Sequence, residues 1–191
     1  MRPLTKMILA LLPLFIAGLA CSKLIPGKVD LFAGSNAADA AAAIKKKVGT
    51  EKVNVTAVEL RSNKMRVTVQ SQQNPKERDE YTYENGSVTG PDPVKVPAVF
   101  ANYVPHATEI GEINFAAVPK MIERAIQLAD AEGAKVDLLS MDNQYASTAN
   151  PQLEGTAGQA WALTWRIFVD TPRVSKYYWA DKDGKLNEKT N

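Results

Sequence analysis

One histidine and its acidic neighbours form the first group that could perform catalysis. His106 is the only histidine of the 191-residue chain, and Glu109 and Glu112 follow it closely. A histidine that a carboxylate orients can act as a general base. No Gly-x-Ser-x-Gly segment accompanies it, and a lone histidine among acidic residues is typical of a surface. We therefore expect this chain not to be an enzyme.

The segment Asp181-Lys182-Asp183-Gly184 could supply oxygen ligands for calcium. A calcium loop of the EF-hand type needs further oxygen ligands and a glutamate at its twelfth position, and the chain offers neither here. An Asp-Gly hairpin turn accounts for the same residues. The sequence therefore predicts no metal site and no cofactor.

Aromatic residues gather in the last part of the chain and divide between two faces of predicted strands. Strand alternation and the usual burial of large rings place four of them in the core: Trp161, Trp165, Tyr177 and Trp179. Tyr178 then points the other way, together with Arg166 and Phe168. Exposed rings beside arginine are typical of binding surfaces, so we predict these three as binding residues.

Residues 142–159 form a long polar segment between two predicted strands. Loops longer than about 12–15 residues are either functional or disordered. Tyr145 and Leu153 are its only large apolar residues, which makes them candidate partner contacts. A mobile hairpin tip is the equally weighted alternative.

Residues 1–20 have the layout of a secretory signal, with basic residues, an apolar run and then small residues. Arg2 and Lys6 are the only charged residues among them. The apolar run over residues 7–17 is shorter than the roughly 20 residues of a membrane-spanning helix. This segment leads directly to Cys21, the only cysteine of the chain.

The stretch from Ile16 to Cys21 resembles the lipobox of bacterial lipoproteins. In that family the cysteine thiol receives a diacylglyceryl group, the signal is removed before the cysteine, and the new amino group is acylated. The resemblance implies lipidation of Cys21 and anchoring in the cell envelope; ordinary cleavage after Ala20 and simple secretion is the alternative. Ser22, by the same resemblance, implies sorting to the outer membrane, facing the periplasm.

The charge balance argues against nucleic-acid binding. The chain has 23 basic and 21 acidic residues. Removal of Arg2 and Lys6 with the signal leaves equal numbers, so the mature chain has no net positive field. Residues 45–47 are its one lysine cluster, and they suit the C-terminal end of a helix.

The mature chain reads as two similar halves behind a tether over residues 21–36. In the half over residues 37–90, an Ala-rich helix that Asn36 caps and Gly49 ends precedes strands with alternating apolar residues. Ser62-Asn63 and Asn85-Gly86 supply turns.

The half over residues 115–191 follows a connector over residues 91–114 and repeats this order. Its predicted helix has Pro119 near the start and Gly133 at the end. A strand containing Val136, Leu138 and Ser140 follows, then the aromatic strands. The fold class expected is α+β, with two related units that each pack one helix on an antiparallel meander of three or four strands.

This twice-used order resembles the PepSY-like group, which includes the tandem repeats of beta-lactamase inhibitor protein. The resemblance rests on the element order, on the similar spacing from Pro75 to Gly86 and from Pro172 to Gly184, and on the turn that Gly184 closes. It implies binding in the cell envelope without catalysis; with the lipobox, this predicts a lipid-anchored envelope protein that binds a protein or peptide. The alternative that it implies is an inhibitor of a secreted or periplasmic hydrolase.

Overall fold

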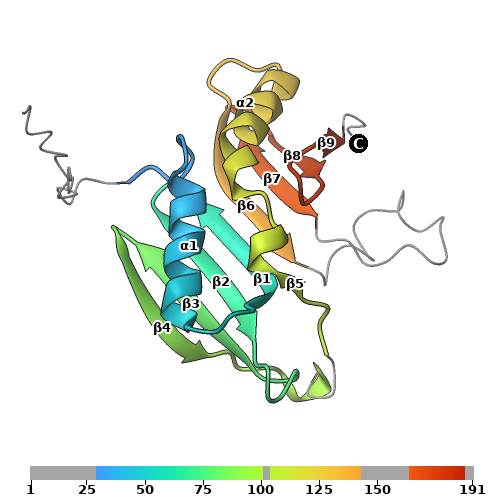
Figure 1. Cartoon of the computed structure of the whole chain (residues 1–191). Coiled ribbons are helices and arrows are strands. Elements are labelled where there is room, and N and C mark those ends of the chain that lie inside the picture. Colours follow the sequence, from blue (N-terminus) through green and yellow to red (C-terminus); the bar gives the residue numbers. More distant parts are fainter. Residues whose placement is uncertain (1–28, 101–103, 143–163, 188–191) are drawn as a thin grey trace, which may run out of the picture.

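The described residues form a nine-stranded antiparallel sheet with two helices (Figure 1). The computed structural model describes residues 29–100, 104–142 and 164–187. The helices are α1 (Asn36–Val48) and α2 (Val118–Ala129). The strands are β1 (Asn54–Arg61), β2 (Lys64–Gln70), β3 (Arg78–Glu84), β4 (Ser87–Pro93), β5 (Thr108–Glu109), β6 (Lys135–Asp142), β7 (Trp165–Asp170), β8 (Ser175–Ala180) and β9 (Leu186–Asn187). Short 3₁₀ turns lie at Ala98–Phe100, Ile110–Glu112 and Phe115–Ala117.

The strand order across the sheet is β4-β3-β2-β1-β6-β7-β8-β9, with β5 paired to one end of β1. The pairing of β1 with β6 joins the two halves of the chain into one sheet, with Val58 opposite Met141 and Leu60 opposite Leu139. Helix α1 packs on β2–β4 and α2 on β6–β9, and both lie on the same face (Figure 1). The predicted α+β class with antiparallel strands is confirmed.

Helix α1 forms where alanine predominates and ends as its glycine predicts. Gly49 has a φ of 75° and its N–H donates to the carbonyl of Lys45 (3.2 Å). The predicted cap is wrong by one residue, because Ser35 holds the N-cap position, without a side-chain cap hydrogen bond. The side-chain amide of Asn36 instead donates to the backbone carbonyl of Asp30 (2.7 Å), which holds the segment that precedes the helix. Within the described residues, neither helix has the length and apolar character that crossing a membrane requires.

Two features of the second half differ from their prediction. Helix α2 ends before Asp130, which adopts the left-handed conformation at φ 45°, and Gly133 lies in the following turn. Strand β6 contains a register shift between Val136 and Leu138 against β7. This irregularity reverses the alternation, so that Leu139 and Met141 face the core in place of Leu138 and Ser140.

The core lies between the helices and one face of the sheet. Leu31, in the predicted tether, is fully buried and its N–H donates to the carbonyl of Ser62 (2.6 Å). Ile110 and Ile113, in the predicted connector, are also buried. Both linking segments therefore contribute to the fold. The largest fully buried side chains include Trp165, Tyr178, Ile44, Leu60, Met65, Met121 and Ile167.

Candidate functional site

The sheet face opposite the helices carries aromatic side chains on β7 and β8. In β7 the side chains of Trp165, Ile167 and Val169 point into the core, so the residues between them point to this open face. We call the group on the open face of β6, β7 and β8 the open-face cluster. Its members are Leu138, Arg166, Phe168, Tyr177 and Trp179.

Strand register aligns these side chains in two rows. Leu138 lies opposite Phe168, which lies opposite Tyr177, and Arg166 lies opposite Trp179. The rings of Phe168 and Tyr177 meet edge to face, with centroids 4.6 Å apart and an interplanar angle of 70°. The guanidinium of Arg166 lies 4.9 Å from the Phe168 ring centroid, within cation–π range. Tyr177 is 52% exposed, so the cluster presents an aromatic edge to solvent.

Arg166 is positioned by a second contact as well as by the ring. Its Nε donates to Oγ of Ser140 on the neighbouring strand (3.3 Å). The contact at Nε and the Phe168 ring together fix the orientation of the planar guanidinium. The cluster therefore combines apolar rings with an oriented cation.

The other half of the open face is polar and paired within itself. Charged side chains on β1, β2, β3 and β6 lie between 2.6 and 4.0 Å from opposite charges. The pairs are Arg61 with Glu59 and Asp137, Arg66 with Glu59 and Glu80, and Lys64 with Glu84. Exposed pairs of this kind contribute only about 0–1 kcal/mol each, and they form an ordinary solvated surface.

The contrast between the two halves marks the cluster as the candidate site. A sheet face in contact with water normally carries polar side chains, as β1–β3 do here. Large rings on such a face lose the benefit of burial unless a partner covers them. Trp, Tyr and Arg are also the residues that dominate binding energy at protein interfaces.

The structure corrects the predicted facing of β8. Tyr178 is only 2% exposed and lies in the core, whereas Tyr177 and Trp179 lie on the open face. In the register with β7, the small Ala180 lies opposite the large Trp165, and this pairing fixes which face of β8 is buried. Because three aromatic residues are adjacent in β8, the sequence there does not indicate which alternate side chains face the core. No local signal could therefore have predicted that Tyr178 is the buried one. Arg166 and Phe168 lie on the open face as predicted.

The Tyr178 hydroxyl has no hydrogen-bond partner among the described residues although it is buried. We expect Tyr178→Phe to raise the free energy of unfolding by about 1 kcal/mol, because it removes a buried polar group that gains no bond on folding. Tyr177→Phe is the matched control, since its hydroxyl lies on a half-exposed ring, and it should change stability by less than about 0.5 kcal/mol. Urea denaturation at neutral pH measures both, and destabilisation by Tyr178→Phe would contradict the expectation.

The same substitution has a defined pH dependence. Burial raises the pKa of Tyr178 above its ordinary value of 10.0, because the phenolate would lose solvation. Since the folded-state pKa is the higher one, this contribution to stability is complete below pH 10.0 and is lost as the pH rises through the folded-state pKa. Burial and then the charge of Asp79 also raise the pKa of Tyr81. Tyr178→Phe should therefore reduce, without abolishing, the loss of stability above pH 10.0.

The residues that suggested catalysis or metal binding are arranged as surface and turn. His106 is exposed, and the Glu109 carboxylate lies 3.6 Å from Nζ of Lys45. Asp181 Oδ1 accepts the N–H groups of Asp183 (3.0 Å) and Lys185 (2.9 Å), which closes the turn between β8 and β9. Among the residues that the structure describes, no group of three or more acidic, histidine or cysteine side chains could hold a metal ion.

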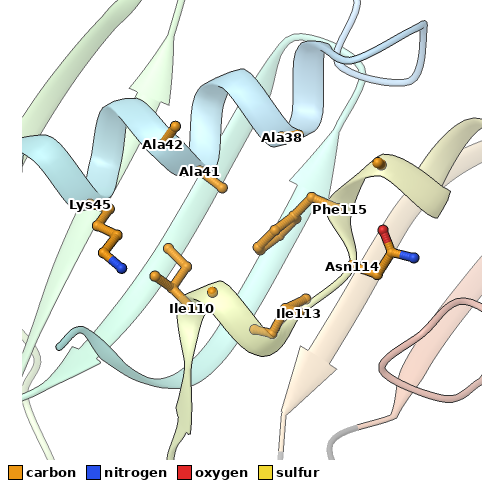
Figure 2. A pocket seen from close by; sticks show the side chains of 10 residues that line it. Ala38, Ala41, Ala42, Lys45, Ile110, Ile113, Asn114 and Phe115 are labelled. Carbon is orange, nitrogen blue, oxygen red and sulfur yellow. The ribbon is translucent and has the colours of Figure 1, made fainter.

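A groove of about 300 Å³ lies between α1 and residues 110–116 (Figure 2). Ala41 of α1 lines one wall, and the side chains of Ile110 and Phe115 project into the space between the two segments. These three residues are at most 6% exposed. A ligand in the groove would therefore bury little further apolar surface, and we interpret the groove as the packing seam between α1 and the connector.

Several predicted positions lie outside the described residues: Cys21, Tyr145, Leu153 and Trp161. The comparisons with known proteins add no relative, since the chain matches no family model, no curated protein and no solved structure. The resemblance to PepSY-like lipoproteins therefore stays a prediction.

Proposed function

We propose that this protein is a lipid-anchored, non-catalytic module of the bacterial cell envelope that binds a protein or peptide through the open-face cluster. The observation that carries the proposal is the cluster itself, in which rings and an oriented arginine occupy a sheet face that the described helices leave uncovered. Aromatic side chains on a sheet face suit a macromolecule, because small molecules bind in concave pockets that bury most of their surface.

The two halves of the chain are proposed to be related units. Each has a helix followed by four strands of the sheet path, and the strands run outward in order from the central β1–β6 pair. The cluster occupies only the second unit, so the units would have diverged on the open face. Superposition of residues 36–93 on residues 118–187 in an experimental structure tests this relation. A helix that crosses the strands in a different direction in the two halves would contradict it.

The anchor is assigned to Cys21, which would be the first residue of the mature chain. Several acyl chains hold a protein at a membrane where a single chain does not. We expect Cys21→Ser to abolish incorporation of labelled palmitate and to release the chain into the soluble fraction of the envelope. Ser22→Asp is the control, since it should retain the label while changing the membrane to which the protein is sorted. A labelled Cys21→Ser chain would contradict the assignment.

The binding surface is tested by a photo-crosslinking residue placed at Tyr177 in the anchored chain in cells. Thr82 is the matched control, because it lies on the same open face in the polar half. We expect a discrete product at Tyr177 with a yield about fivefold above that at Thr82, and its loss in a Phe168→Ser background. Equal yields at both positions would contradict the proposal, and a hydrolase as the crosslinked protein would favour the inhibitor alternative.

A further inference from the structure

Among the residues that the structure describes, part of one edge of β8 has no paired strand, next to the open-face cluster. On one side, all six residues of β8 pair with β7. On the other side, the described residues of β9 pair with Trp179 and Ala180. Within the described part of the chain, Ser175–Tyr178 therefore have no neighbouring strand on that side.

The hairpin register identifies which backbone groups face this edge. The N–H of Asp181 donates to the carbonyl of Lys185 across the β8–β9 turn (3.1 Å). In an antiparallel pair every second residue directs its N–H and C=O toward the same neighbour. Counting back from Asp181, the residues that face the free edge are Tyr177 and Ser175, while Lys176 and Tyr178 face β7.

The opposite edge of the sheet is closed to strand addition. Strand β4 contains Pro91 and Pro93, which lack N–H donors, and its register with β3 is interrupted between Glu80 and Thr82. Prolines and bulges of this kind prevent an edge from pairing with another chain. The residues Ser175–Tyr178 contain neither device, and exposed Val174 precedes them.

The charge around the β8 edge is positive. Residues 164–187 contain five basic and three acidic side chains. Lys182 lies 3.3 Å from Asp183 and Lys176 donates to the carbonyl of Ala129 (2.6 Å), whereas Arg173, before β8, and Lys185, before β9, are exposed. Charge complementarity therefore favours a ligand that carries carboxylates.

We infer that the free edge of β8 accepts an extended, acidic segment of a partner protein as an added antiparallel strand, with its apolar side chains on the open-face cluster. Residues that lie opposite each other in a sheet share a face, so ligand residues paired with Tyr177 would meet the rings of the cluster. This inference rests on the proposed function and specifies how the partner is held.

The test uses the full chain in detergent and a synthetic peptide of about eight residues that alternates valine and glutamate. Amide hydrogen exchange is measured by NMR. In the free protein, the amides of Ser175 and Tyr177 should exchange about tenfold faster than those of Lys176 and Tyr178, which are paired with β7. Saturating peptide should slow Ser175 and Tyr177 by about tenfold and leave the other two unchanged.

Two N-methylated peptides supply the matched control. When valines face the cluster, the valine amides point toward β8, so methylation of valines should abolish binding and methylation of glutamates should not. A peptide that alternates valine and lysine should bind about tenfold more weakly, and added salt should reduce this difference.

The inference is overturned if Ser175 and Tyr177 are already as protected as Tyr178 in the free chain. It also fails if no peptide protects them at millimolar concentration, or if the two methylated peptides bind equally. The proposed function stands apart from these outcomes, because crosslinking at Tyr177 in cells would survive the absence of an added strand.

Discussion

Trp165→Ala is expected to lower the free energy of unfolding by about 3–5 kcal/mol. Trp165 is fully buried in β7, and its ring meets that of Phe115 edge to face, with centroids 5.9 Å apart at 81°. Phe115 belongs to the segment that leads into α2, so this ring pair joins the sheet to the second helix. The indole N–H has no partner among the described residues, so the expected loss comes from packing and the resulting cavity.

Trp179→Ala is the matched control for this prediction. It removes the same side chain from the same sheet, but from the open face, and should cost only about 1 kcal/mol. Urea denaturation followed by circular dichroism measures both variants. If Trp165→Ala leaves too little folded protein, Trp165→Phe retains part of the packing and should show an intermediate loss. Equal losses for the two alanine variants would show that β7 and β8 do not face as described.

Gly184→Ala is expected to cost about 2–5 kcal/mol, through backbone strain and overpacking together. Gly184 has a φ of 86° in the β8–β9 turn, a conformation that residues with a side chain rarely adopt. A Cβ at this position would overlap the Cβ of Ala117 and lie 3.3 Å from Cγ of Met121. The turn therefore packs directly against the start of α2.

The matched control is Gly86→Ala in the β3–β4 turn. Gly86 has a similar φ of 81°, but a Cβ there meets nothing within 4 Å. This variant should lose about 1–2 kcal/mol, from the backbone term alone. Adding Ala117→Gly to Gly184→Ala should recover part of the difference, because it removes one of the overlapping atoms. Thermal unfolding of all variants measures the loss of stability in each. Equal losses for Gly184→Ala and Gly86→Ala would contradict the close contact at Gly184.

The correctly predicted elements depend on residues close together in the sequence. Alanine-rich composition with Gly49 behind it specified α1, and Asn85-Gly86 specified the β3–β4 hairpin. Alternation around Met65, Val67 and Val69 specified the buried face of β2. These signals arise from propensity, turn geometry and periodicity, all of which act within a few residues.

The errors arose where a distant segment decides the outcome. Which side chains of β8 point into the core depends on how Tyr178 and Ala180 pair with β7. Whether Leu138 points into the core depends on the irregular pairing of β6 with β7. The local position of Asn36 predicts a helix cap, but its side-chain amide donates a hydrogen bond to the backbone carbonyl of Asp30 instead. Local patterns therefore predict the candidate site only in part: they place Arg166 and Phe168 on the open face correctly, but place Tyr177 and Trp179 in the core.

By itself, the sequence determined the two helices and the order of the longer strands, because hydrogen bonding within helices and turns is local, but it did not predict β5 or the 3₁₀ turns. Only the tertiary structure decided that β1 and β6 join both halves into one sheet and that Tyr177 faces solvent while Tyr178 is buried. The physical reason is that strand pairing joins backbone groups far apart in the chain. A shift of one residue in that pairing exchanges the buried and exposed faces without changing any local preference.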